Sequence, residues 1–217
     1  MPKYRMYKDP AQFGAKIGKP PAKTIRYLGL DLGSNCGVAV FDFEEGKKVL
    51  RDNLQLFQWD LSTQGLESGA MRFVRLRAFL NATKPDVIGY EDVKYSPPKE
   101  FFVNKKFGIP AVLSRVATAS EVLGGMKVTV ATWAQEANLL ATGFAISTIK
   151  KVATGNGKAS KDDMIAAANH IFGAAFDSSK YKSTGIDNVV DAAFVVMILM
   201  QTVQAGIANT AVRNGKK

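Results

Sequence analysis

The sequence predicts an α/β domain built on a mixed five-stranded sheet flanked by helices, and three observations favour this fold class. Three strand-like segments follow one another over residues 26–59 with short turns between them, as is typical of antiparallel strands. A helical segment at 68–83 leads into a short apolar segment at 85–92, and a strand after such a crossover helix usually lies parallel to its partner. A second helical segment precedes a fifth strand-like segment at 127–131.

The composition is that of one ordinary globular domain. Of the 217 residues, 47% are hydrophobic and 22% are charged, which is enough for a sizeable core. The single cysteine, Cys36, excludes an internal disulfide framework and favours a reducing cytosol. The N-terminus lacks an apolar signal core, and the longest apolar block, 192–200, is shorter than the ~18 residues of a membrane span. We therefore expect a cytoplasmic protein with no membrane partner.

The net charge of +10 is concentrated at the two ends of the chain. Residues 1–26 contain seven Lys or Arg and one Asp, and residues 205–217 contain three Lys or Arg and no acid, which leaves only +1 for the rest. We expect a basic, extended arm at 1–24, a domain at 25–204 and a basic tail at 205–217. Such ends bind a polyanion through counterion release, and the alternative is that they only solubilise the protein.

The first predicted strand, 26–32, ends on an acid. Leucines alternate along it with smaller or polar residues, a glycine-containing turn follows at 33–37, and the next strand occupies 37–43. A carboxylate at the end of a buried strand needs a partner, and the turn glycines allow a phosphate or a metal to come close. We interpret Asp31 as a metal ligand, and the alternative is an aspartate that caps the turn.

A second acid ends the fourth strand. The third strand is predicted near 48–59, and the helix at 68–83 ends at Lys84-Pro85. The strand at 85–92 carries Glu91, which is expected at the same edge of the sheet as Asp31 if the two strands are parallel. The alternative is that Glu91 is a surface residue.

The second half of the chain is mostly helical. A loop at 93–106 interleaves aromatic residues with lysines, and helices are predicted at 108–125 and 144–153. A short helix is also predicted to begin at Thr132, which forms a capping box with Gln135. Ser160 and Asp163 form a second capping box. The last helix, 187–204, is apolar almost all round and is therefore expected to be buried.

Two further acids lie on this last helix. Asp187 and Asp191 are four residues apart and so share one face. Together with Asp31 and Glu91 they offer hard oxygen ligands, which suit Mg²⁺ or Mn²⁺, with two ions ~3.5–4 Å apart as in nucleases that cut phosphodiesters. Asp187 has the alternative role of helix N-cap, whereas an idle charge at Asp191 would be costly inside an apolar helix.

These segments resemble the RuvC-type Holliday-junction resolvases of the RNase H-like superfamily. The resemblance rests on 31–37, on the strand ending in Glu91, on 187–193, and on 149–161, where Lys150 and Lys161 bracket a glycine-rich turn. It spans about 25–204, and the segment before it suggests a phage-encoded branch.

The resemblance implies an RNase H-like fold and a magnesium-dependent homodimer that resolves four-way DNA junctions by paired nicking in a bacterial or phage-infected cell. It implies that Asp31, Glu91 and Asp191 bind the metal ions and that Lys161 and Lys150 contact phosphates. The family's fourth ligand falls on Asn188, which is a possible ligand here. Either Asp187, one residue earlier, takes that role, or the second metal ion is held more weakly. The predicted DNA-binding residues are Lys150, Lys151, Lys158, Lys161, Tyr95, Phe101, Phe102, Lys105 and Lys106.

Other functions remain open on the residues alone. A flap or general branched-DNA nuclease would use the same acids, and a non-cleaving junction-binding protein would suit the departure at Asn188. The aromatic residues at 95–107 have the alternative of packing under their loop or at a dimer interface. An actin-like ATPase also carries an Asp-x-Gly-(x)3-Gly turn, but that fold needs a duplicated second half, for which 217 residues are too few.

Overall fold

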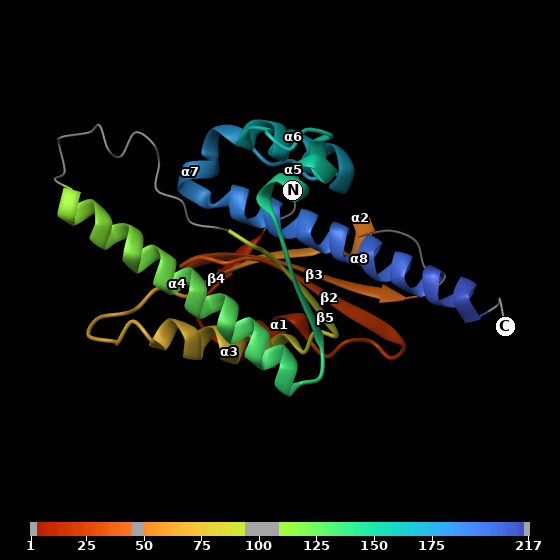
Figure 1. Cartoon of the computed structure of the whole chain (residues 1–217), viewed down its shortest axis with the longest axis horizontal. Helices are drawn as coiled ribbons and strands as arrows, with labels where there is room; N and C mark the ends of the chain where they lie inside the picture. The colour runs from red at the N-terminus through yellow and green to blue at the C-terminus, as the bar shows by residue number, and fades with distance from the viewer. Residues whose placement is uncertain (1–3, 45–49, 94–108, 215–217) are drawn as a thin grey trace.

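The computed structural model describes residues 4–44, 50–93 and 109–214, which form one sheet with helices on both faces (Figure 1). Within these residues the sheet has six strands in the order β1-β4-β3-β2-β5-β6. The strands are β1 (Arg5–Tyr7), β2 (Thr24–Asp31), β3 (Asn35–Glu44), β4 (Gln55–Asp60), β5 (Val87–Glu91) and β6 (Leu140–Phe144). The predicted run of three antiparallel strands is confirmed as β2, β3 and β4, and β5 lies parallel to β2 as expected. The third strand is shorter than the predicted 48–59, because Leu50–Asn53 is helical.

The helices form one layer on each face of the sheet (Figure 1). They are α1 (Pro10–Ile17), α2 (Leu50–Asn53), α3 (Met71–Thr83), α4 (Ile109–Glu136), α5 (Ile146–Thr154), α6 (Lys161–Phe172), the 3₁₀ helix η2 (Ser178–Lys180), α7 (Tyr181–Thr184) and α8 (Ile186–Asn214). Residues of α1, α3 and α4 form one core cluster with the strands, and residues of α5, α6 and α8 form another on the opposite face. The predicted α/β class is therefore confirmed, with six strands where five were expected.

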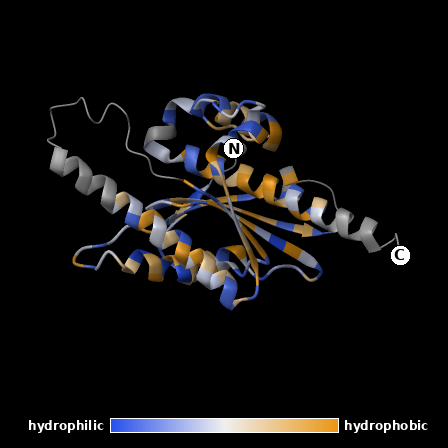
Figure 2. Ribbon diagram, in the orientation of Figure 1, coloured by the Kyte–Doolittle hydropathy of each residue, from blue (hydrophilic) through white to orange (hydrophobic). Residues whose placement is uncertain are grey.

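Helix α8 is the central element of its layer. Val189, Ala192 and Val196 are fully buried, and the helix packs on β2, β3 and β5. In Figure 2 the hydrophobic colouring runs along α8 and the strands beside it. The segment Ile186–Gly206 is long and apolar enough to cross a membrane, with a mean hydropathy of 1.6, but half of it is buried in this core. Packing against the sheet accounts for that composition.

The structure differs from the predicted strand at 127–131 and from the predicted helix start at Thr132. Helix α4 runs through both, and through the glycine pair 124–125 that we interpreted as a helix end. Gly125 instead permits close packing, because a Cβ atom there would lie only 2.4 Å from Cζ of Phe73 in α3. The fifth predicted strand is replaced by β6, which pairs in parallel with β5.

The structure also differs from the extended arm expected at 1–24. Asp9 caps α1 by accepting a hydrogen bond from the backbone N–H of Ala11. Phe13 of α1 is fully buried and packs edge-to-face on Phe57 and Trp59, while β1 pairs with β4. The basic side chains of residues 4–24 are therefore carried by folded backbone. At the other end, α8 continues to Asn214, so residues 205–214 of the predicted tail are helical.

A buried arginine fastens the N-terminal segment to the sheet. The guanidinium of Arg26 is fully buried and donates to both carboxylate oxygens of Asp42, at 2.6 and 2.8 Å. It also donates to the backbone oxygens of Gly18 and Thr83, each at 2.9 Å. Four hydrogen bonds thus join the end of α1, β3 and the end of α3 through one side chain.

We expect Arg26→Ala to lower the free energy of unfolding by about 3–5 kcal/mol, because it leaves Asp42 without the partner of a buried ion pair. Urea denaturation followed by circular dichroism measures this loss. Arg77→Ala is the matched control, since Arg77 pairs with Glu136 in a largely exposed position and should contribute much less. Equal losses for the two variants would contradict the role assigned to Arg26.

Candidate active site

Asp31 and Glu91 end two neighbouring parallel strands. In the register of β2 and β5, Leu30 lies opposite Tyr90, so the next residue of each strand emerges at the same edge of the sheet. The Glu91 side chain is buried and Asp31 is partly buried. The expectation that these two acids lie side by side is confirmed.

Glycines in β2 and β3 bring the third acid to the same edge. A Cβ atom on Gly37 would lie 2.0 Å from the backbone oxygen of Asn188, and one on Gly29 would lie 2.3 Å from that of Ala192. Helix α8 therefore rests directly on the strand backbones, at a distance that side chains would not allow. This close approach lets Asp191 of α8 face the ends of the strands.

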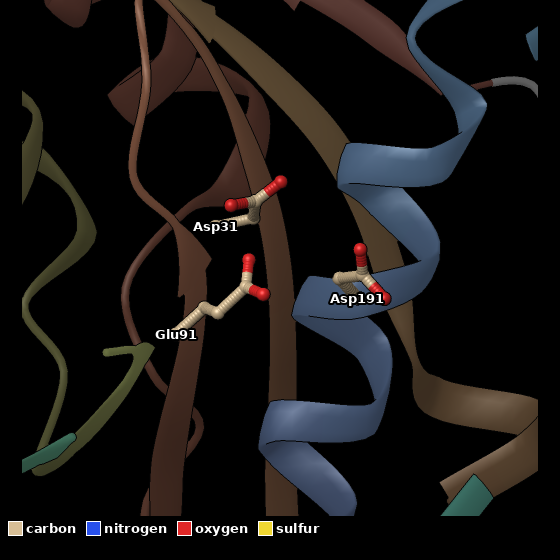
Figure 3. Close-up of side chains that lie close together, drawn as sticks. All are labelled: Asp31, Glu91 and Asp191. Atoms are coloured by element: carbon tan, nitrogen blue, oxygen red, sulfur yellow. The ribbon is translucent and has the colours of Figure 1, made fainter. Parts of the chain in front are cut away.

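The three acids form one cluster. One carboxylate oxygen from each of Asp31, Glu91 and Asp191 lies within 4.8 Å of the other two. Figure 3 shows the three side chains directed toward one another from β2, β5 and α8. Magnesium and calcium ions bind carboxylate oxygens at ~2.0–2.6 Å, so this spacing fits a divalent cation held between the acids. The predicted convergence of acids from distant parts of the chain is confirmed for these three.

Burial and mutual repulsion raise the pKa values of two of the three acids. Burial, and then the charge and hydrogen bonding of Glu91, raise the pKa of Asp31 well above its ordinary value. Burial, followed by the charges of Glu91 and Asp187, raises the pKa of Asp191 to about 7, although Lys161 and Lys150 oppose the shift. A cation among the carboxylates would offset this repulsion, so the electrostatics also fit a metal site.

The fourth predicted acid has a different partner. Asp187 lies in the first turn of α8 and forms an ion pair with Nζ of Lys161. Asp187 lines the cavity that the three acids face, but its carboxylate does not belong to the cluster of three oxygens. The amide nitrogen of Asn188 donates to the backbone oxygen of Asn35, at 2.8 Å. The structure therefore brings Asp187 and Asn188 beside the cluster without placing either within it.

The acids face a cavity of about 290 Å³ that also holds two predicted lysines, Lys150 and Lys161. Nζ of Lys150 donates to the backbone oxygen of Ala159, at 2.6 Å, and so spans the glycine-rich turn between α5 and α6. That turn is built as predicted: Gly155 ends α5 with a positive φ of 79°, and the capping box of Ser160 and Asp163 begins α6. Ile146 of α5 and Met164 and Ile165 of α6 are apolar residues that also line the cavity.

The remaining predicted DNA-binding residues lie elsewhere. Lys151 and Lys158 are exposed and do not line the cavity. Tyr95, Phe101, Phe102, Lys105 and Lys106 lie outside the described residues.

Two contacts at the start of α8 were missed by the sequence analysis. Nε2 of the buried Gln58 donates to the backbone oxygen of Gly185, at 2.9 Å, and the hydroxyl of Tyr4 donates to that of Thr184, also at 2.9 Å. They hold the segment that leads into Asp187. The available signal was Gln58 itself, which is polar within the otherwise apolar segment 56–59.

No family model and no curated protein sequence matches the chain. Among solved structures, the chain is similar to RuvC of Thermus thermophilus, with a TM-score of 0.54 and 19% identity, over 84% of this chain and 97% of that one. It is also similar to T. thermophilus RuvC in complex with a Holliday junction substrate, with a TM-score of 0.56 and 17% identity, over 84% of this chain and 96% of the other. At these identities the likeness establishes the fold. The predicted RNase H-like fold and the resemblance to RuvC-type resolvases are confirmed at that level.

Proposed function

We propose that this protein is a metal-dependent endonuclease that cleaves four-way DNA junctions by paired nicking. The observation that carries the proposal is the cluster of Asp31, Glu91 and Asp191, whose oxygens lie within 4.8 Å of one another on a RuvC-like fold. One of the similar structures holds a Holliday junction substrate, which favours branched DNA as the substrate class. We place the activity in the cytoplasm of a bacterial or phage-infected cell.

The three clustered acids would hold the metal ions, and Asp187 would complete the site on the side of α8. All the proposed ligands are oxygens, which favours Mg²⁺ or Mn²⁺, with two ions per site. When bound, such ions activate water for attack on phosphorus and stabilise the departing 3′ oxygen. Burial, and then the charge of Asp31, raise the pKa of the nearby Cys36 thiol well above its ordinary value.

The lysines of the cavity would act on the DNA. Lys161 is about half exposed at its side chain and is paired with Asp187, so its ammonium lies where a phosphate oxygen could share it. Lys150 lines the same cavity from α5. We assign both to binding and orienting the phosphate that is cut. A four-way junction has two equivalent strands to cut, so a symmetric homodimer with two such sites matches the substrate.

The test is incubation of the purified protein with a labelled four-way junction and Mg²⁺ or Mn²⁺, beside linear duplex and flap controls. The proposal expects symmetric nicks in the junction and little cutting of duplex. Faster cutting of flaps than of junctions would assign the same site to a general branched-DNA nuclease. Tight junction binding with no nick in Mn²⁺ would overturn the nuclease proposal in favour of a non-cleaving junction-binding protein.

We expect cation binding to depend on pH. The pKa values of Asp31 and Asp191 are higher in the folded protein than in the unfolded chain. The metal-free protein therefore loses stability as the pH rises from the pKa of an unfolded aspartate, ~4, to the folded-state pKa of Asp191, about 7. A divalent cation replaces the protons, so the rise in melting temperature on adding Mn²⁺ should be larger at about pH 8 than at about pH 5.5. Thermal melts at both pH values measure this difference.

Asp191→Asn provides the control for the pH experiment, because it removes one of the titrating ligands. In this variant the rise in melting temperature should be small at both pH values. An equal effect of Mn²⁺ on the wild-type protein at the two pH values would contradict the assignment of the acids as ligands.

A further inference from the structure

A second cavity lies beside the N-terminal strand. It is lined by residues 4–7, Lys16, Phe57, residues 175–177, Lys180 and Ile186. Its volume is about 900 Å³, which lies within the range of ligand-binding clefts. We call it the N-terminal groove. Nothing in the proposed cleavage chemistry uses it.

The N-terminal groove has an aromatic floor. Tyr7, Phe57 and Phe176 line it and are almost fully buried, so their positions are fixed by the core. The ring of Tyr4 is only partly buried and packs edge-to-face on Phe176, with the centroids 6.2 Å apart. The exposed part of the Tyr4 ring, held in place by Phe176, offers a stacking surface that accepts any nucleic-acid base.

Cations surround this floor. Arg5, Lys16 and Lys180 line the N-terminal groove, against one acid, Asp177, which pairs with Lys180 at 3.1 Å. The guanidinium of Arg5 lies 5.3 Å from the ring centroid of Tyr7. Two of the three cations belong to the basic segment 1–26. Because that segment is folded, its charge is presented at a fixed place, and the groove is complementary to a polyanion.

A smaller cavity of about 340 Å³ lies between the N-terminal groove and the candidate active site. It shares Met6 with the groove. It shares Lys161, Asp187 and Asn188 with the cavity of the acids. The three cavities are therefore neighbours, in the order acid cluster, start of α8 and aromatic floor.

We propose that the N-terminal groove binds the DNA strand that leads away from the phosphate at the acid cluster. Arg5, Lys16 and Lys180 contact its phosphates, and the aromatic floor receives a base. This inference rests on the proposed function, because the nuclease activity is what places a phosphate at the acid cluster. The neighbouring positions of the three cavities and the excess of cations favour nucleic acid over a protein partner, for which paired charges of both signs would be expected.

The test measures the salt dependence of junction binding by the full-length protein. The probe is a fluorescently labelled four-way junction, titrated with protein between about 50 and about 200 mM salt, without divalent cations so that no cutting occurs. The variant is Lys16→Gln combined with Lys180→Gln, which removes two exposed cations of the groove. The matched control combines Lys19→Gln with Lys84→Gln, which removes the same charge at two exposed positions that do not line the groove.

The proposal expects the groove variant to bind the junction on the order of tenfold more weakly at low salt. The slope of log K against log salt should fall by about 2, since each phosphate contact contributes ~0.9 to it. The control should keep the wild-type slope. Met6→Glu, at a position that is 40% exposed, places a carboxylate where the two cavities meet and should also weaken binding. Melting temperatures check that each variant is folded.

An unchanged slope in the groove variant, or an equal fall in the control, would overturn the proposal. So would a changed sedimentation coefficient with an unchanged slope, which would make the groove a protein contact. Cleavage by the wild-type protein in Mn²⁺ is measured in parallel, so that the two proposals are judged separately. Junction binding that depends on the groove without any cleavage would support the groove and overturn the nuclease.

Discussion

Asp31→Asn and Asp191→Asn are expected to abolish cleavage of a four-way junction while leaving junction binding largely intact. Each substitution keeps the size of the side chain and removes one carboxylate from the cluster. Loss of a metal ligand removes several kcal/mol of charge stabilisation, so cleavage should fall by roughly a thousandfold or more. Single-turnover cleavage in Mg²⁺ and a binding titration without metal measure the two effects.

The same variants should be more stable than the wild-type protein when no metal is present. The carboxylates of Asp31 and Asp191 are partly buried and repel their neighbours once they are ionised at about pH 8, so removing one charge relieves the repulsion. A melting temperature above that of the wild-type protein at about pH 8, combined with lost activity, is the expected signature. Asp162→Asn is the control, because that exposed residue does not line the cavity of the acids, and cleavage and melting temperature should both stay near the wild-type values. Wild-type cleavage by both cluster variants would contradict the metal site.

Gly37→Ala is expected to disable the site without touching an acid. The new Cβ atom would lie 2.0 Å from the backbone oxygen of Asn188 and 2.9 Å from the backbone nitrogen of Val189, so the first turns of α8 must move away from the sheet. Overpacking of this kind costs about 1–3 kcal/mol of stability. Since Asp187 and Asp191 lie on those turns, cation binding and cleavage should be lost together.

Gly33→Ala is the matched control for Gly37→Ala. It lies in the turn between β2 and β3, four residues before Gly37, but the atom nearest to a new Cβ is the backbone oxygen of Asn35, 4.0 Å away. Urea denaturation, thermal shifts with Mn²⁺ and junction cleavage compare the two variants. Wild-type cation binding by a folded Gly37→Ala protein would show that α8 does not need this close approach to place its acids.

The acids at the ends of strands were predictable from local sequence. Asp31 and Glu91 each end an apolar run, and parallel strands bring such ends to one edge, so their meeting follows from the order of the elements. Asp191 was predictable because a charge inside an apolar helix is costly without a partner. The role of Asp187 was less accessible, because its ion pair with Lys161 depends on the tertiary position of α6.

The errors in the fold prediction have a common physical origin. Gly125 resembled a helix end because glycine is a frequent helix terminator, but its purpose is to admit the ring of Phe73 from another helix. The N-terminal segment resembled an arm because its apolar residues are few and widely spaced. Its local signal was Asp9 followed by Pro10, which is typical of a capped helix start. The depth at which Phe13 is buried depends on β4 and α3.

Anomalous X-ray scattering from crystals soaked in Mn²⁺ would show whether the three carboxylates form one cation site. We expect manganese peaks between the carboxylates of Asp31, Glu91 and Asp191, and none there in crystals of Asp191→Asn. Manganese found only at other surfaces of the wild-type protein, with the three carboxylates left without an ion, would contradict this expectation.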